Sequence, residues 1–347
     1  MLNARQQSIL FQVIRSYVSS GEPVSSSHIA RSGVVDVSSA TIRNVMGDLE
    51  AQGLLRQPHT SAGRIPTPGG LRLFIDTLSV EGLPAGDPAL VHIQGELDAM
   101  EGKDMEQAAH TVGSLLSDLV RLTSIVSTPS LGSIRLEDIH LSPLSERRVL
   151  AILVASDARV YHQVVPMNQE VDRTQLKRMQ GYLSELAIGL TLEEVRTKVR
   201  REMLALARQA NELVRLALEI GAQAIESTQP KVVVEGKFNV FDYDELTADT
   251  ERLKHLLELL EEKEQVLELL DGFDEGQRPA VLLGPELDLG LGLGDEVSLI
   301  VCGYGQQDEA SGLLGVIGPS RVDYERILPL IHQTALALST YLGNQNK

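Results

Sequence analysis

Apolar residues near the amino terminus recur at three- and four-residue steps, which is the spacing of one buried helix face. The first run consists of Ile9, Leu10, Val13, Ile14, Tyr17 and Val18. Asn3 can cap this helix in a capping-box arrangement, and Gly21 ends it. The segment 22–24 is then expected to be extended, because Pro23 disfavours a helical conformation in the residue before it. Serines 25–27 can cap a short second helix, which ends at Gly33.

A third helix is predicted from Ser38 or Ser39 to about Gln52. Its buried stripe is Ile42, Met46 and Leu49, and its outward face holds Ser39, Ala40, Thr41, Arg43, Asn44 and Gly47. This face suits a DNA-reading helix, since arginine can pair with guanine, asparagine can pair with adenine, and hydroxyls reach phosphates. An ordinary amphipathic helix would show a similar polar face, so the helix alone does not decide between the two interpretations.

A predicted hairpin follows this helix directly. Residues 54–56 form a short strand, residues 63–65 form its return, and residues 58–62 form the loop. This order of elements is typical of a winged helix-turn-helix, with Arg64 placed to enter a minor groove or to bind phosphate. The predicted DNA-binding residues are Ser38, Ser39, Thr41, Arg43, Asn44, Arg56, His59, Thr60, Ser61 and Arg64.

The rest of the chain alternates between helical and strand-like patterns. Residues 79–88 form a predicted linker rich in Gly and Pro, and residues 89–126 are predicted to be helical. Strands are expected at 133–141, 149–154, 160–165, 281–283, 297–302 and 313–317, before a closing helix at 324–342. Strands before and after a long helical block indicate one mixed sheet interrupted by an insertion.

A heptad pattern marks the predicted insertion. Two interleaved sets of small and apolar residues alternate steps of four and three, which is typical of a continuous helix-packing seam. We interpret this seam as a dimerisation surface made of Val199, Met203, Leu206, Ala210, Leu213, Ala217, Ile220 and Ala224. A second leucine-rich helix is expected at 253–270. The alternative, that both helices pack within one subunit, stays open.

Composition and charge narrow the function classes. A chain of 347 residues with 43% hydrophobic and 23% charged residues is long enough for two or three folded domains. Residues 1–78 carry seven arginines, no lysine and five acidic residues, whereas the other residues carry a net charge of −19. Such asymmetry is typical of a nucleic-acid-binding head on an acidic body, although +2 by itself is close to neutral. With no signal segment and no apolar run of membrane-spanning length, a cytoplasmic protein is expected.

No pattern of residues predicts an enzyme, a metal site or a cofactor. The glycine-rich segment 290–294 lacks the following helix of a phosphate-binding loop, and the residues around Asp242 and Asp244 lack the glycine of a calcium loop. The eight histidines show no ligand pairing on one helix face. Cys302 lies in an apolar strand pattern, where packing is a better explanation than nucleophilic chemistry.

Three segments of the amino-terminal region resemble HrcA, the family of bacterial heat-inducible transcription repressors. They are the residues 21–24, 40–44 and 57–67, and residues 315–326 near the carboxyl terminus resemble the same family. The resemblance implies a GAF-like domain interrupted by a dimerising insert. It also implies an inverted-repeat operator of the class called CIRCE, upstream of chaperone operons, and the GroE chaperonin as the partner that maintains active repressor.

We therefore predict an α+β protein with a winged helix-turn-helix domain at 1–78, a linker at 79–88, a GAF-like domain at 89–190 and 278–347, and a mainly helical inserted dimerisation domain at 191–277. The predicted function is a homodimeric repressor that binds double-stranded operator DNA, without a cofactor and without a membrane. The alternative is a metabolite-sensing regulator with the same head and a ligand in the GAF-like domain.

Overall fold

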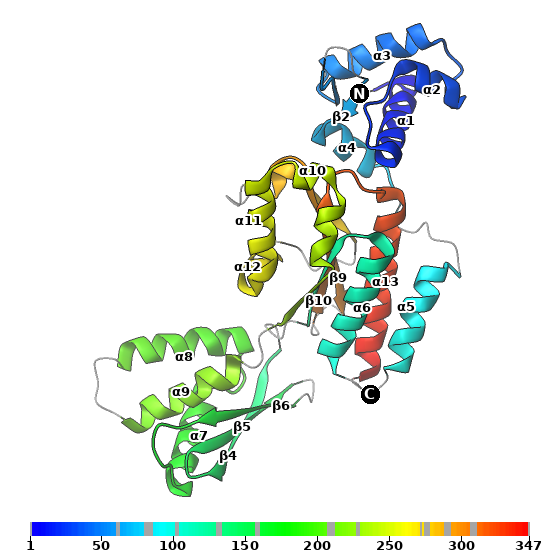
Figure 1. Ribbon diagram of the computed structural model, residues 1–347. Helices are drawn as coiled ribbons and strands as arrows, with labels where there is room; N and C mark the ends of the chain where they lie inside the picture. Colours follow the sequence, from blue (N-terminus) through cyan, green and yellow to red (C-terminus); the bar gives the residue numbers. More distant parts are fainter. Residues whose placement is uncertain are drawn as a thin grey trace.

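The computed structural model describes residues 2–59, 63–79, 86–100, 104–129, 134–156, 160–206, 212–226, 230–270, 273, 278–287, 293–305 and 311–345. Helices and sheets are mixed in three units, which we call the head (residues 2–79), the middle unit (86–129 and 230–345) and the inserted unit (134–226). The head and the inserted unit lie at opposite ends of the middle unit (Figure 1). No helix among the described residues combines the length and the apolarity needed to cross a membrane.

The head follows the predicted order of elements closely. It consists of α1 (Ala4–Ser20), α2 (Ser26–Ser32), α3 (Ser39–Ala51), β1 (Leu55–Arg56), β2 (Ile65–Pro66) and α4 (Pro68–Ile75). Asn3 caps α1 in a capping box, and Gly21 ends it in the left-handed conformation at φ 73°. Ser25 and Ser38 accept hydrogen bonds from backbone amides in the first turns of α2 and α3. The predictions of the helix boundaries in this region are therefore confirmed.

The middle unit is built around a five-stranded antiparallel sheet. Its strands, in spatial order, are β7 (Val232–Glu235), β3 (Thr123–Ser127), β10 (Ser311–Pro319), β9 (Val297–Gly305) and β8 (Ala280–Leu283). Side chains alternate between the two faces of β9. Ile300 and Cys302 belong to the core that includes α5 (Pro88–Ala99), α6 (Met105–Val120) and α13 (Tyr324–Gln345). Leu299 and Val301 belong to the core that includes α11 (Thr250–Glu261) and α12 (Lys263–Leu270).

Short elements complete one end of the middle unit. They are the 3₁₀ helix η1 (Lys237–Asp242), the helix α10 (Asp244–Thr247) and the 3₁₀ helix η2 (Gly284–Glu286). Asp242 is the last residue of η1 and Asp244 is the first residue of α10. Of the glycine-rich segment 290–294, only residues 293 and 294 lie within the described residues.

The inserted unit has its own sheet and its own core. The strands β4 (Leu136–Ser145), β5 (Arg148–Ala155) and β6 (Val160–Pro166) pair in that order and antiparallel. The helices α7 (Arg173–Ala187), α8 (Leu192–Leu206) and α9 (Glu212–Glu226) pack with them around a separate apolar cluster. In this way a chain segment that leaves the middle sheet after β3 returns to it at β7 (Figure 1).

This topology corrects the predicted boundaries of the insertion. The three strands expected at 133–165 do not extend the sheet formed by the later strands, because they pair only with one another among the described residues. Conversely, α11 and α12 cover the middle sheet and do not belong to the insertion. The insertion therefore occupies residues 134–226 and not 191–277. Of the predicted linker at 79–88, residues 80–85 lie outside the described residues.

Three predicted helices are shorter than the sequence indicates. The pattern expected to be helical to residue 126 ends at Val120, because Arg121 adopts the left-handed conformation at φ 58° and β3 begins two residues later. The helix predicted at 253–270 is divided into α11 and α12 at Glu262, whose backbone is extended. The continuous helix predicted to carry the heptad seam is two helices, α8 and α9.

Candidate nucleic-acid interface

The helix α3 presents the predicted DNA-reading residues on its exposed face. Ile42, Met46 and Leu49 are buried in the head, as expected. Arg43 and Asn44 follow the first of these in sequence, and both are exposed. The helix lies on the side of the head that is turned away from the middle unit (Figure 1). A DNA duplex can therefore approach this face without meeting the rest of the subunit.

Hydroxyl groups fix the amino-terminal end of α3. The Ser38 hydroxyl accepts a hydrogen bond from the Thr41 backbone amide at 3.2 Å and lies 2.9 Å from the Thr41 hydroxyl. Ser39 Oγ lies 3.1 Å from Oγ of Ser26, a buried residue of α2. Ser39 is therefore occupied in joining α2 to α3, whereas Ser38 is exposed. The positive end of the helix dipole and the unpaired amides of the first turn favour an anion at this place.

The hairpin lies directly after α3 and is tied to the start of the head. Leu55 pairs with Pro66 and Arg56 with Ile65, while Val24 and Arg64 exchange two backbone hydrogen bonds of 2.9 Å. Gly63 is required here, since a Cβ atom at this position would lie 2.4 Å from the Val24 backbone. Arg56 and His59 are exposed on this hairpin. The predicted contacts Thr60 and Ser61 lie outside the described residues.

The structure places Arg64 differently from the sequence prediction. Its guanidinium contacts Glu50 of α3, with Nε and Nη2 lying 2.9 Å and 2.8 Å from Glu50 Oε2. Only 19% of the Arg64 side chain is exposed. In this conformation the ion pair turns the guanidinium toward α3 and neutralises its charge, so that the predicted contact of Arg64 with a minor groove or a phosphate stays a prediction. In this arrangement Arg64 joins the hairpin to α3.

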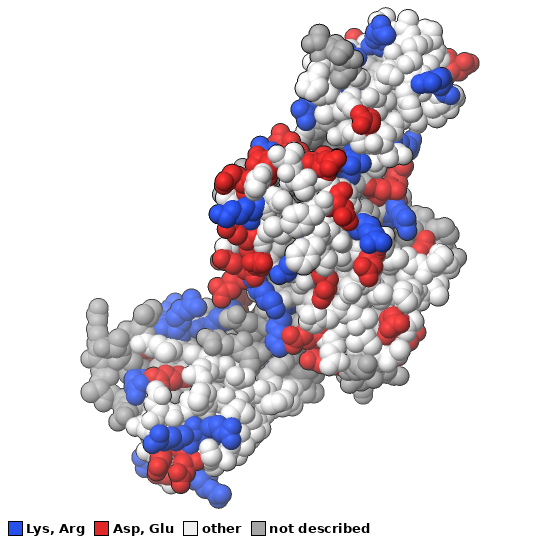
Figure 2. Space-filling model, in the orientation of Figure 1, with Lys and Arg blue, Asp and Glu red and all other residues white. Residues whose placement is uncertain are grey.

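The arginines of the head divide into two groups. Arg15, Arg64 and Arg72 form ion pairs with Glu325, Glu50 and Glu286. The other group consists of Arg5, Arg31, Arg43 and Arg56, and all four are exposed. Among the described residues, none of these four arginines has an acidic partner within ion-pair distance. Acidic side chains gather instead over α10, α11 and α12 of the middle unit (Figure 2). The unpaired positive charge of the head is thus available to a polyanion.

The predicted dimerisation residues are mostly buried within their own chain. Val199 of α8 and Ala217, Ile220 and Ala224 of α9 belong to the core of the inserted unit, where the two helices pack on each other. Leu213 is partly buried against the same core, and Met203 is 39% exposed. Ala210 and the side chain of Leu206 lie outside the described residues. Packing within the chain is thus sufficient to explain the buried positions, and their role in dimerisation stays a prediction.

The structure reveals an apolar surface that the sequence analysis missed. On β5, Val149, Ala151, Leu153 and Ala155 face the helices and are buried, whereas the alternate residues Leu150, Ile152 and Val154 are only partly buried. On the edge strand β6, Val160 and Val164 are 57% and 40% exposed. These five residues form what we call the outer sheet face. The sequence of β5 contains this signal, since apolar residues occupy both faces of the strand although helices cover only one of them.

The described residues hold no cluster of three or more side chains suited to bind a metal ion. Cys302 is buried in β9, and burial raises the pKa of its thiol to about 12. A thiol of this kind stays protonated at neutral pH and is a poor nucleophile.

Comparison with known proteins identifies the family of the chain. Residues 106–328 match the model of the HrcA protein C-terminal domain. The heat-inducible transcription repressor HrcA of Nitrosomonas eutropha is 34% identical over 99% of this chain and 100% of its own length. That of Methylobacillus flagellatus is 32% identical over the full length of both chains. A crystal structure at 2.2 Å resolution of a protein described as hypothetical is also similar, with a TM-score of 0.63, 25% identity, and coverage of 99% of this chain and 100% of the other. The family consists of transcription repressors and not of enzymes, and this chain belongs to it: it is a heat-inducible transcription repressor of the HrcA family.

Proposed function

We propose that the head is a winged helix-turn-helix that reads operator DNA through α3. The observation that carries this proposal is the exposure of Arg43 and Asn44 on α3, a helix that lies on the side of the head turned away from the middle unit (Figure 1). Ser38, Thr41, Arg56 and His59 lie around this face or on the hairpin, where they can reach phosphates. The loop residues Thr60 and Ser61 stay in the proposal on the strength of the sequence alone.

The middle unit is proposed to be GAF-like, with the inserted unit as the place where two copies associate. The outer sheet face supports association through the inserted unit, because an uncovered apolar sheet surface favours a partner. The distribution of charge along the chain also supports association through the inserted unit. Residues 134–226 contain thirteen acidic and thirteen basic residues, so that the net charge of −19 outside the head is carried entirely by the other residues. Two copies repel each other through their middle units but not through their inserted units.

A homodimer of this kind would present two recognition helices to an inverted repeat. Two-fold symmetry gives each half-site the same protein surface, which matches the symmetry of an operator of the CIRCE class. Occupancy of such an operator represses transcription by obstructing the polymerase. The operator class, the chaperone operons that it controls and the modulation by the GroE chaperonin are proposed on the basis of family membership. The site of action is then the cytoplasm, where the operator lies.

A DNA-shift titration tests the proposal. Purified protein is titrated with a promoter fragment carrying a CIRCE-type inverted repeat and with a fragment of the same length and scrambled sequence, at several salt concentrations, with and without GroE chaperonin. We expect tighter binding to the inverted repeat, weaker binding to both fragments as salt rises, and a larger active fraction with chaperonin. Equal affinity for the two fragments under every condition would contradict sequence-specific repression.

A further inference from the structure

Three arginines connect the head to the middle unit, and we call Arg15, Arg72 and Arg321 the arginine clamp. The first contact joins Arg15 of α1 to Glu325 in the first turn of α13. The Arg15 Nε lies 3.2 Å and 3.1 Å from the two Glu325 carboxylate oxygens, and Nη2 lies 2.8 Å from Oε1. The same guanidinium lies over the ring of Phe74 of α4, 5.6 Å from its centroid. Bidentate contacts of this type fix the relative orientation of the two side chains as well as their distance.

The second contact places an arginine of the middle unit beneath the end of α1. Nη1 of Arg321 donates to the Val18 carbonyl at 3.2 Å, while Nε donates to Glu245 of α10. Val18 is in the last turn of α1, where carbonyl groups lack helical partners and attract a positive charge. The approach is close, since a Cβ atom on Gly21 would lie 3.2 Å from the Arg321 guanidinium carbon. Although burial opposes ionisation of Glu245, the hydrogen bond from Arg321 lowers its pKa overall, so that the pair is charged at neutral pH.

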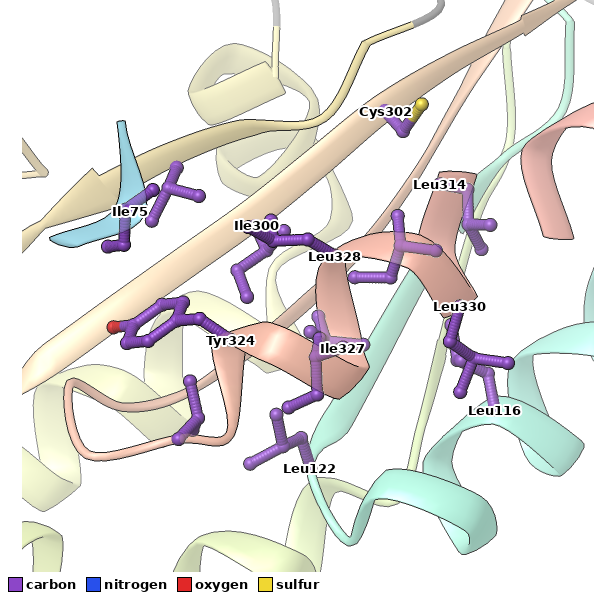
Figure 3. Packing of buried hydrophobic residues seen from close by; sticks show 14 of the residues in the cluster. Ile75, Leu116, Leu122, Ile300, Cys302, Leu314, Tyr324, Ile327, Leu328 and Leu330 are labelled. Carbon is purple, nitrogen blue, oxygen red and sulfur yellow. The ribbon is translucent and has the colours of Figure 1, made fainter. Parts of the chain in front are cut away.

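The third contact comes from α4. Arg72 donates to the Val281 carbonyl at 2.7 Å and to the carboxylate of Glu286, which lies next to β8. Beside it, Ile75 belongs to the same apolar cluster as Ile300 and Tyr324 of the middle unit (Figure 3). The head therefore shares part of its core with the middle unit and is not suspended on a linker.

Beside this shared core, the junction contains open space. A groove of 460 Å³ is lined by Arg15 and Phe74 of the head and by Leu122, Tyr243 and Arg321 of the middle unit, among others. Across this groove, charged contacts act together with the shared apolar core to fix the orientation of the head. Loss of those contacts leaves room for the head to rotate about the apolar contact of α4.

Orientation of the head matters for operator choice, given the dimer of the proposed function, on which this inference rests. Inserting one base pair between two half-sites moves them by about 3.4 Å and rotates them by about 34° relative to each other. Rigidly held heads cannot follow this change, whereas loosely held heads can. We propose that the arginine clamp is a specificity determinant, which lets the repressor discriminate between operators that differ only in half-site spacing.

The test uses substitutions in the middle unit, so that the DNA-binding surface keeps its sequence. The double variant Glu286→Gln/Glu325→Gln removes the charged partners of Arg72 and Arg15 with almost no change in shape. The matched control, Glu106→Gln/Glu258→Gln, removes the same charge from two ion pairs within the middle unit, those with Lys231 and Lys254. The probe is a series of CIRCE-type inverted repeats whose spacer is lengthened by single base pairs up to half a helical turn, together with an isolated half-site.

For the wild-type protein and the control variant, we expect binding to weaken by about tenfold or more when the spacer is half a turn too long. The clamp variant is expected to show a penalty of about threefold or less, with unchanged half-site affinity and unchanged dimerisation. Glu325→Arg, which faces Arg15 with a second arginine, is expected to relax spacing in the same way, and adding Arg15→Glu to it is expected to restore the penalty. Thermal unfolding verifies that each variant is folded.

A clamp variant with the wild-type spacing profile would overturn the inference while leaving the proposed function intact. Wild-type protein that binds the half-site as tightly as the inverted repeat would instead overturn the dimeric function, and the inference with it.

Discussion

Arg43 and Asn44 occupy neighbouring positions on the exposed face of α3, and neither has a partner that would hold it away from DNA among the described residues. Replacing either with alanine is expected to cost about 1–3 kcal/mol of binding free energy on the operator, because each can make a paired contact with one base. Binding to scrambled DNA is expected to change much less. Competition titrations with the two DNAs give both numbers for each variant.

Arg200→Ala provides the control for the loss of one positive charge, since Arg200 is exposed on α8 of the inserted unit, at the opposite end of the molecule. It is expected to leave operator binding nearly unchanged. If Arg43→Ala lowered binding to operator and scrambled DNA by the same factor, Arg43 would contact a phosphate and not a base.

Arg56 and Arg64 lie on the two arms of the hairpin but in opposite environments. Arg56→Ala is expected to weaken binding to all DNA and to lower the salt slope by about one, with little change in stability, as for an exposed phosphate contact. Arg64→Ala is expected to do the reverse. It leaves Glu50 without its partner and costs about 1 kcal/mol of unfolding free energy, with little change in salt slope.

Salt-dependent titration and chemical unfolding of both variants measure these effects side by side. A reduced salt slope for Arg64→Ala would show that the Glu50–Arg64 pair opens when DNA binds.

The sequence contains enough information to predict an arginine near the hairpin but not the direction of its side chain. Glu50 and Arg64 are fourteen positions apart, and their contact depends on how closely the return strand approaches α3. That approach in turn depends on the Val24–Arg64 bridge, which joins segments forty residues apart. Long-range pairing of this kind leaves no periodic signal, whereas the stripe of Ile42, Met46 and Leu49 does.

At the scale of the element, the start of α3 combines stability with anion attraction. Ser38→Ala is expected to cost about 1 kcal/mol of unfolding free energy through loss of the helix cap. Ser38→Asp is expected to preserve the cap but to weaken DNA binding, because its carboxylate faces the phosphates. Thermal unfolding and operator titration separate the two effects.

Ser38→Asn is the matched neutral variant, since asparagine has the shape of aspartate and caps a helix equally well. It is expected to preserve stability and most of the DNA affinity. Equal DNA affinity for the Asp and Asn variants would place the start of α3 away from the phosphate backbone.

Elements with local signals were predictable, and elements defined by their partners were not. The capping residues Asn3, Ser25 and Ser38 and the terminating glycines mark the ends of the head helices directly in the amino-acid sequence. In contrast, β3 follows α6 without a glycine or a proline between them, and its apolar residues Ile125 and Val126 are compatible with a continued helix. The run of residues 133–165 shows strands correctly, but alternation cannot reveal which sheet a strand joins.

At the scale of the whole molecule, the head and the middle unit act as one folded body. The same apolar cluster extends from Ile9 of α1 to Leu342 of α13, and it includes Ile75 at the junction. The sequence indicates separate domains because Gly and Pro are frequent in residues 79–88. A high content of Gly and Pro indicates that a connecting segment is flexible. It does not show which contacts the two connected parts make with each other. Head orientation is therefore a property of the assembled molecule.

The outer sheet face of the inserted unit makes the most direct prediction about assembly. Val160→Glu places a charge on this face and is expected to weaken self-association by about tenfold or more, because burying an unpaired carboxylate is costly. Val91→Glu is the matched control, since Val91 is a valine with the same 57% exposure on α5 of the middle unit. It is expected to leave association unchanged.

Sedimentation equilibrium over a range of protein concentrations measures the dissociation constant of each variant. Operator affinity is expected to rank the variants in the same order as self-association. A monomer binds one half-site at a time and lacks the higher affinity that comes from binding both. If Val160→Glu stayed fully dimeric, association would have to use another surface, and exposed Met203 of the predicted helical seam would be the next position to change. The two surfaces predict different placements of the heads, so this measurement also decides which half-site spacings a dimer can reach.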